Sequence, residues 1–383
     1  MITHPLLTDA HHALRERIRE FAEKEIKPVA AQLDETEEFS IELTAKMGEA
    51  GLFGIQVPKE LGGHGLDTLS YIIMVEEIAR VDSSQAATIA AVNSLAIAPI
   101  LKYGTPEQIK KYIPPLTDGR MTWAFGLTEE NAGSDAMGSQ TTAELVDGYW
   151  VINGEKRHIT NSTSEISGGV IVQAMTGEIN GRKKLSAIIV EKGTPGFTRE
   201  RSFGKLMWRA SDTGRLYFDN VKVPASNLLG EVGQGGRIML NTLDSGRLSV
   251  AAIGLGLAQG AFEEAIAHSK KRVQFGQPIH KFQAVSFKMA DMDMKIELAR
   301  NTLYNACWKK DNNMQFAREA AISKLYTSEI AREIADESLQ IHGAAGVFKP
   351  HPVERFYRDQ RLLQIGEGTS EILRMVIARY NGV

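Results

Sequence analysis

A single carboxylate near the C-terminus has the setting of a catalytic group. Glu367 lies between Gly366 and Gly368, and Thr369 precedes an apolar helical pattern. Because threonine before such a pattern is typical of a helix N-cap, Glu367 is expected in an elbow just ahead of a helix N-terminus. Flanking glycines let another molecule approach the backbone closely. A carboxylate placed there could accept a proton from a substrate. For this segment considered alone, a loop glutamate beside an ordinary cap is the simpler interpretation.

Two further segments could bind a ligand. Residues 126–135 read as a strand that enters a loop of small residues, where backbone N–H groups and hydroxyls could hold a planar ring or an anion. This loop is neither a dinucleotide-binding fingerprint nor a P-loop, so for the loop considered alone an ordinary turn is the better interpretation. His158 ends a later strand, where a surface or capping histidine is more common than a catalyst. No spacing of metal ligands or of a catalytic triad stands out, and no metal is expected.

Glycine and basic residues mark the helical C-terminal part of the chain. Gly246 lies inside a predicted helix, where glycine costs about 1 kcal/mol relative to alanine, so another group is expected to approach the backbone there. Lys270, Lys271 and Arg272 end the same helix. They are either favourable cations at a helix C-terminus or a clamp for a phosphate.

The elements that must position these residues fall into three blocks. The first block is helical, with a run that Pro28 is expected to end and an almost wholly apolar helix over 83–103. Strands follow over about 122–225, with hairpin turns at Asp147-Gly148 and at Asn153-Gly154. Helices are then predicted over 235–271, 281–311, 315–342 and 370–381. The fold class is therefore α+β, with domains at 1–121 (helical), 122–232 (a β-barrel or sandwich) and 233–383 (a helical bundle).

Composition narrows the classes of partner and compartment. The chain has 383 residues, 44 basic and 47 acidic side chains, and a net charge of -3, which gives no reason to expect nucleic acid or an anionic membrane. Its one cysteine, Cys307, falls in a helical pattern and is expected in the core. No apolar run is expected to span a bilayer and no signal peptide is apparent, so a reducing, cytoplasmic location is predicted.

Six motifs in one order resemble the acyl-CoA dehydrogenase family, flavoenzymes that introduce a double bond between Cα and Cβ of an acyl thioester. They are GLTEENAGSD (126–135), HITN (158–161), WRASDTGRLYFDNVKVP (208–224), RVQFGQPI (272–279) with Gln283, QIHGAAG (340–346) and GEGTSEI (366–372). The resemblance covers nearly the whole chain. It implies a helical N-terminal domain, a middle β domain and a C-terminal four-helix bundle.

The resemblance also implies the chemistry. Glu367 matches the family's catalytic base, which removes the α-proton while FAD accepts the β-hydride. Some branched-chain and long-chain members place the base in the first bundle helix, at a position occupied here by Gly246, which cannot serve. Closure of the acyl chain over Glu367 is expected to remove water and raise its pKa. The backbone N–H of the base and a flavin hydroxyl are expected to hold the thioester oxygen.

The resemblance assigns further residues to the cofactor and the substrate. Within one chain the cofactor residues are Phe125, Leu127, Thr128, Gly133, Ser134, His158, Ile159, Thr160, Thr369 and Glu371. Another set matches positions at the FAD of a neighbouring subunit or flanks them in the same motifs: Arg272, Phe275, Phe282, Gln283, Gln340, His342, Gly343 and Ala344. The substrate set is Ser134, Asp244, Arg247 and Gly368. Shared sites imply a homo-oligomer, commonly a tetramer.

Three departures from the family pattern leave the core chemistry in place. His158 replaces an aromatic residue, Gly366 replaces a tyrosine, and Glu130-Asn131 replaces Pro-Gly. No arginine occurs at 92–94, where glutaryl-type members place one, so a dicarboxylic substrate is not expected.

Three hypotheses follow. The first is an acyl-CoA dehydrogenase that passes electrons to electron-transfer flavoprotein. The second keeps the fold but acts on a carrier-protein thioester, or uses oxygen as an oxidase or monooxygenase. The third is a non-catalytic, flavin-bearing interaction protein, and the intact Glu367 argues against it.

Overall fold

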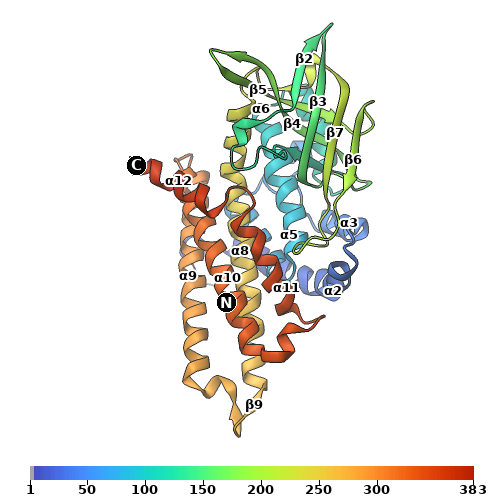
Figure 1. Cartoon of the computed structure of the whole chain (residues 1–383). Coiled ribbons are helices and arrows are strands. Elements are labelled where there is room, and N and C mark those ends of the chain that lie inside the picture. Colours follow the sequence, from blue (N-terminus) through green and yellow to red (C-terminus); the bar gives the residue numbers. More distant parts are fainter. Residues whose placement is uncertain (1–3) are drawn as a thin grey trace.

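The computed structural model describes residues 4–383, apart from the side chain of Ile179. Helices at both ends of the chain pack together into one elongated body, and the β domain sits at one end of it (Figure 1). The order of helices, sheet and helices agrees with the predicted α+β class. The exact domain limits at 121 and 232 stay a prediction.

The N-terminal domain is helical, and one of its helices runs past the expected break. Pro28 lies in the first turn of α2 (Lys27–Thr36), directly after the π-helical turn η1 (Ala22–Ile26) that continues α1. The predicted stop was wrong because a first-turn proline lacks only an N–H that needs no partner there. The other helices are α1 (Asp9–Phe21), α3 (Ile41–Glu49), α4 (Thr68–Ala79), α5 (Ser83–Ala90), the π-helical η3 (Ala91–Ile97), α6 (Ala98–Tyr103) and α7 (Pro106–Tyr112).

The middle domain is one eight-stranded sheet in the order β6-β7-β3-β2-β4-β5-β8, with β1 paired in parallel with β4. The turn at Asp147-Gly148 is confirmed, since both residues have the positive φ that a type I′ hairpin requires. The strands are β1 (Thr122–Gly126), β2 (Thr142–Val146), β3 (Tyr149–Thr160), β4 (Ser167–Ile179), β5 (Arg182–Glu191), β6 (Phe197–Arg201), β7 (Thr213–Pro224) and β8 (Leu228–Leu229).

The turn predicted at Asn153-Gly154 was wrong, because both residues lie inside β3. The register between β3 and β7 shifts between Ile152 and Gly154, as at a β-bulge. A Cβ at Gly154 would lie 2.6 Å from Thr141 Oγ1, so this glycine permits a close approach of two segments.

The C-terminal domain contains the predicted long helices and one that was missed. Its elements are α8 (Gly235–Lys271), a two-stranded hairpin of β9 (Val273–Gln274) and β10 (Gln277–Pro278), α9 (Gln283–Asp311), α10 (Ala317–His342), α11 (Pro352–Asp359) and α12 (Ser370–Tyr380). The unpredicted helix is α11. Short 3₁₀ turns connect elements throughout the chain: η2 (Lys59–Leu61), η4 (Pro114–Leu116), η5 (Ala136–Gly138), η6 (Ala225–Asn227), η7 (Ile279–Lys281), η8 (Gly343–Val347) and η9 (Gln360–Gln364).

In the part of the chain that the structure describes, two helices are long and apolar enough to cross a membrane by length and composition, contrary to the expectation that no apolar run would be. They are the continuous helix Ser83–Tyr103 and α8. In their most apolar stretches 83% and 72% of the residues are buried inside the protein. Burial in a protein core accounts for their apolar character, as it does for any core helix.

Glycines let α8 pack closely against its neighbours. A Cβ at Gly256 would overlap the Glu76 carbonyl of α4, and one at Gly260 would overlap the Arg80 carbonyl. Gly254 faces the backbone of Thr327 in α10. The backbone of α8 therefore lies against both α4 and α10, and these contacts fix the position of α8 and its side chains relative to the two neighbouring helices.

We expect Gly256→Ala to destabilise the protein by about 1–3 kcal/mol, because the added methyl group forces α8 away from α4. Urea unfolding of the purified protein measures the change. Ala267→Val adds methyl groups on an exposed part of the same helix and is expected to change stability by less than about 0.5 kcal/mol. Equal stability of Gly256→Ala and the parent protein would contradict this account of the packing.

Candidate active site

Glu367 lies in the elbow that the sequence predicts. Its φ is +53° and that of Gly368 is +99°, so two consecutive residues turn the chain through the left-handed region. Thr369 Oγ1 then accepts a hydrogen bond from the Ile372 N–H at 3.2 Å and caps α12. A non-glycine residue with positive φ is uncommon, and such residues cluster at functional sites.

The group that approaches Gly246 is the Glu367 carboxyl itself. A Cβ at position 246 would overlap Glu367 Oε2, with Leu95 of η3 next to it at 3.3 Å. Glu367 as a whole is half-buried, but its Oε2 atom is shielded from solvent and has no hydrogen-bond partner among the described residues. Burial raises the pKa of Glu367 to about 7, and the cations Lys324 and Arg247 act against this rise. Desolvation was expected to require substrate, yet the fold alone already supplies it.

Two charged residues of α8, Asp244 and Arg247, lie on the helical turn that contains Gly246. Arg247 Nη1 donates to Asp244 Oδ1 at 2.6 Å, and the Arg247 side chain is buried. Burial also raises the pKa of Asp244, against the effects of Arg247 and Lys102. The Arg247 Nε has no partner among the described residues. The pair therefore offers hydrogen-bonding groups beside the candidate base.

Hydrogen bonds fasten the elbow and the residues that flank it to α10. Lys324 Nζ donates to the Gly368 carbonyl at 2.6 Å, Ser328 Oγ donates to the Leu363 carbonyl at 2.8 Å, and Ser370 Oγ donates to Glu329 Oε1 at 2.7 Å. Sequence reasoning missed Lys324 and Ser328. The signal was present, because both lie on the buried stripe of α10 that includes Ala320, Ala321 and Ala331.

The structure brings the two predicted flavin segments of the β domain together. The Arg157 N–H donates to the Thr128 carbonyl at 3.0 Å, which joins the loop after β1 to the end of β3. A register shift between Lys156 and Ile159 gives His158 a φ of +60° and leaves its side chain exposed. Partial burial of the ring, in a side chain that is otherwise exposed, acts together with the cations Arg157 and Arg215 to lower the pKa of His158.

The residues of this surface fit a flat, uncharged ring system. Phe125 and Leu127 are apolar, Thr128 and Thr160 carry hydroxyls, and the lowered pKa of His158 favours the neutral form of its imidazole. Nothing lies within 4 Å of a Cβ built at Gly133, so there is open space in front of the loop. Ser134 is exposed beside it.

A buried ion pair that the sequence analysis missed holds this loop. Lys156 Nζ contacts Glu129 Oε1 at 2.6 Å, and Thr141 N also donates to that oxygen. Both charged side chains are buried. Burial alone would raise the pKa of Glu129, but the neighbouring Lys156 lowers it to about 2. Burial lowers the pKa of Lys156 to about 8. Lys156 continues the inward-facing alternation of Trp150 and Ile152 along β3, which was the available signal.

The second predicted cofactor set lies far from the first. Arg272 ends α8, 26 residues after Gly246, which is about 39 Å along the helix at 1.5 Å per residue. Figure 1 shows β9 at the end of the bundle opposite the β domain. Phe275 is 94% exposed, and Arg272, Gln283 and Gln340 are exposed as well. One chain therefore does not bring the two sets together. The remaining members of this set, Phe282, His342, Gly343 and Ala344, belong to the same end.

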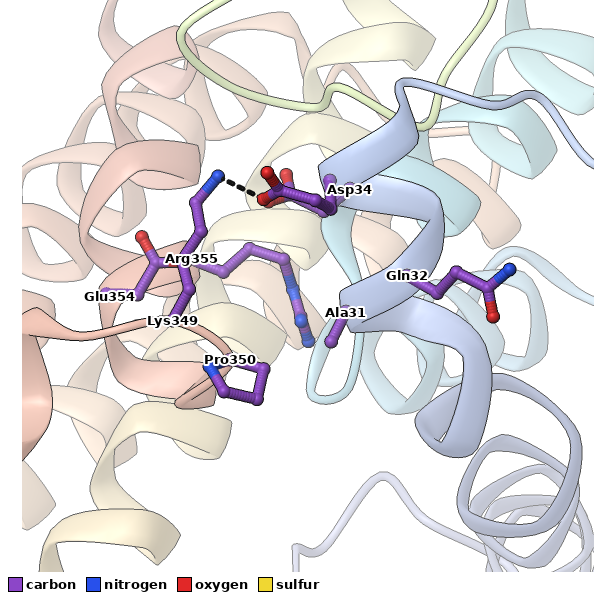
Figure 2. Close-up of a pocket in the computed structure, with 8 residues that line it drawn as sticks. Ala31, Gln32, Asp34, Lys349, Pro350, Glu354 and Arg355 are labelled. Carbon is purple, nitrogen blue, oxygen red and sulfur yellow. Dashed lines mark hydrogen bonds and ion pairs between the residues drawn. The ribbon is translucent and has the colours of Figure 1, made fainter.

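A separate pocket of about 340 Å³ lies between α2 and α11 (Figure 2). Lys349 forms an ion pair with Glu35 at 2.6 Å across its mouth, and Arg355 lines the wall. None of the predicted site residues lines this pocket. Within residues 4–383, no group of three or more histidine, cysteine or acidic residues could hold a metal ion.

The pKa of Glu367 implies a pH-dependent cost in stability. Its folded-state pKa of about 7 exceeds the ordinary 4.5, so the penalty is absent below about pH 4 and grows as the pH rises towards 7. We expect Glu367→Gln to stabilise the protein, by up to about 2 kcal/mol more at pH 8.5 than at pH 5.5. Urea unfolding at the two pH values tests this. The exposed control Glu16→Gln should show no such difference, and a Glu367→Gln gain that does not depend on pH would refute the assignment.

Comparisons with known proteins agree with this arrangement. Three family models match: the acyl-CoA dehydrogenase N-terminal domain at residues 8–120, the middle domain at 124–221 and the C-terminal domain at 233–381. The chain is 43% identical over 372 residues to a short-chain specific acyl-CoA dehydrogenase of Clostridium acetobutylicum, covering 97% of this chain and 98% of that protein.

Two solved structures share the fold over nearly their whole length. Butyryl-CoA dehydrogenase from Megasphaera elsdenii has a TM-score of 0.95 and 41% identity, with 100% of both chains covered. A chain in a structure reported for the electron transferring flavoprotein of Acidaminococcus fermentans has the same TM-score and identity, with 99% of both chains covered. The helical, sheet and helical domains, the buried carboxyl in its elbow and these matches lead to one conclusion: the chain belongs to the acyl-CoA dehydrogenase family and is an FAD-dependent acyl-CoA dehydrogenase.

Proposed function

We propose that Glu367 is the base that removes the α-proton of a short, unbranched acyl-CoA. The observation that carries the proposal is its Oε2 atom, which is shielded from water, unpaired among the described residues and placed against the bare backbone of Gly246. A base with a pKa near the working pH is the most effective, and the pKa of about 7 meets that condition. The names of the relatives support a short acyl chain.

The side chains of the site divide the reaction between two faces of the substrate. The Cα–H bond breaks towards Glu367, which takes the proton, and the electron pair of that bond forms the new Cα–Cβ double bond. Bound FAD supplies the acceptor for the hydride that leaves Cβ. Its ring would lie on Phe125, Leu127, Thr128, Gly133, Ser134, His158, Ile159 and Thr160.

The groups near the elbow are suited to hold the substrate in place. The Glu367 backbone N–H is proposed to donate to the thioester oxygen, since charge develops on that oxygen as the proton leaves. Asp244 and Arg247 are proposed to contact the polar part of the thioester, with Ser134 and Gly368 beside it. Thr369 and Glu371 are proposed to contact the cofactor from the first turn of α12.

The cofactor set at the far end of the bundle supports an oligomer in which one chain completes the site of another. Arg272, Phe275, Gln283 and Gln340 are exposed there, at the end of the bundle away from the β domain of their own chain. Phe287, Met294 and Leu298 add an exposed apolar stripe at helical spacing on α9. We propose that the oligomer is a homotetramer. We also propose that it passes its electrons to electron-transfer flavoprotein, and the similarity to a chain in the structure reported for the electron transferring flavoprotein of Acidaminococcus fermentans supports this acceptor. A cytoplasmic location stays a prediction.

Glu367→Gln tests the base directly. The amide retains the size of the side chain but accepts no proton, so we expect butyryl-CoA to bleach the flavin about 10²–10⁴-fold more slowly in anaerobic single-turnover mixing. Flavin content should match that of the parent protein, because the Thr369 cap and the backbone are unchanged. A panel of longer CoA thioesters and a carrier-protein thioester, each with and without oxygen, separates the alternative substrates and acceptors. Bleaching of the variant at the parent rate would place the base elsewhere.

Arg272→Ala tests the shared site. Removal of a guanidinium that reaches the cofactor of another chain should lower both the flavin per chain and the fraction of oligomer, as measured by absorbance and sedimentation velocity. Lys271→Ala removes a neighbouring exposed cation and should leave both unchanged. A monomeric fraction that retains its full flavin would contradict the shared site.

A further inference from the structure

Lys324 is a buried cation close to Glu367 that takes no part in the proton transfer proposed above. It lies in the middle of α10 with no exposed surface, and it is among the largest fully buried side chains in the described structure. Lysine is almost never buried unless it is paired. No carboxylate lies within ion-pair distance of Lys324 in the described structure; instead Nζ donates to the Gly368 carbonyl at 2.6 Å.

That bond fixes the residue directly after Glu367. Gly368 and Glu367 both have positive φ, and this pair of residues determines where the carboxyl points. A hydrogen bond from a charged donor is shorter and stronger than one between neutral groups. The bond therefore holds the elbow in the conformation that places Oε2 over Gly246.

The charge of Lys324 also acts on the carboxyl. Lys324 has the largest electrostatic effect on Glu367, ahead of Arg247, and Glu367 has the largest charge effect on Lys324 in return. Burial lowers the pKa of Lys324 to about 8 and raises that of Glu367 to about 7, so the two groups titrate as a coupled pair. The other charged or titratable groups facing this pair are Arg247 and Asp244 of α8, Tyr71 of α4, Glu329 of α10 and Glu371 of α12.

We propose that Lys324 is a positioning residue for proton abstraction, which fixes the elbow through the Gly368 carbonyl and sets the pH range in which Glu367 accepts the α-proton. The inference rests on Glu367 as the base. Since a cation favours the carboxylate, loss of Lys324 raises the pKa of Glu367 and moves the activity to higher pH.

The experiment measures the rate of anaerobic flavin bleaching by butyryl-CoA between pH 5.5 and 9.5 in the flavin-loaded enzyme. Lys324→Met removes the charge and the hydrogen bond while retaining an unbranched side chain. Its pH midpoint should rise by about one unit, and the rate at pH 6 should fall about tenfold. Lys324→Gln retains a donor without the charge and should show the same shift, which keeps the test open if the methionine variant does not fold.

Two further variants separate charge from simple loosening of the elbow. Ser328→Ala removes another α10 hydrogen bond to the segment before the elbow, so it should leave the pH midpoint unchanged even if the rate falls. Lys324→Arg retains the charge and should stay closer to the parent midpoint than the glutamine variant does.

The outcomes distinguish this inference from the proposed function. If Glu367→Gln is inactive and the Lys324→Gln midpoint equals that of the parent, the role of Lys324 is wrong and the base assignment stands. If Glu367→Gln bleaches at the parent rate, the base assignment fails first. Equal midpoint shifts in Ser328→Ala and Lys324→Gln would also overturn the role of the charge.

Discussion

The desolvation of one carboxyl group is the constraint on which the rest of this site depends. An isolated carboxylate is expensive to bury, so the protein must supply partial compensation without neutralising the group. Here Lys324 and Arg247 reduce the penalty from a distance, and neither forms an ion pair with Glu367 in the described structure. A direct ion pair would hold the carboxylate in its charged form and weaken it as a base. The observed compromise leaves a group that can both give up and accept a proton near neutral pH.

This arrangement requires rigid surroundings, and the packing of α8 supplies them. Its glycines bring the helix backbone against α4 and α10, so the surface below the carboxyl is backbone that cannot rotate away. A second buried charge, Lys156, holds the loop of the β domain in a similar way, through Glu129 and the Leu127 carbonyl. Both lysines lie inside regular elements and fasten an irregular segment. Regular structure thus fixes the two loops that carry the chemistry.

The sequence allowed much of the fold to be predicted, because long apolar patterns and helix caps are local signals. The Thr369 cap and the Asp147-Gly148 turn are confirmed. The errors at Pro28 and Gly154 have one cause: a residue that commonly ends an element was instead used within it, at a π-helical turn and at a β-bulge.

The site was predictable only in part. Single side chains such as Glu367 and His158 were identified from motifs, and the structure places them in an elbow and in a bulge. Lys324, Lys156 and Glu129 were missed because their importance comes from tertiary contacts between distant segments. A lysine on a buried stripe or on the inner face of a strand breaks the local pattern, and that conflict was the available signal. The group opposite Gly246 could be expected from the helix, but its identity required the fold.

The contact between Gly246 and Glu367 also determines how substitutions at the two positions combine. A side chain added at position 246 would occupy the space of the Glu367 Oε2 atom, so the carboxyl, as the end of a flexible side chain, would have to move. The two positions therefore share one volume beside α8. Because substitutions of contacting residues are not additive, the effect of a change at position 246 depends on which residue occupies position 367.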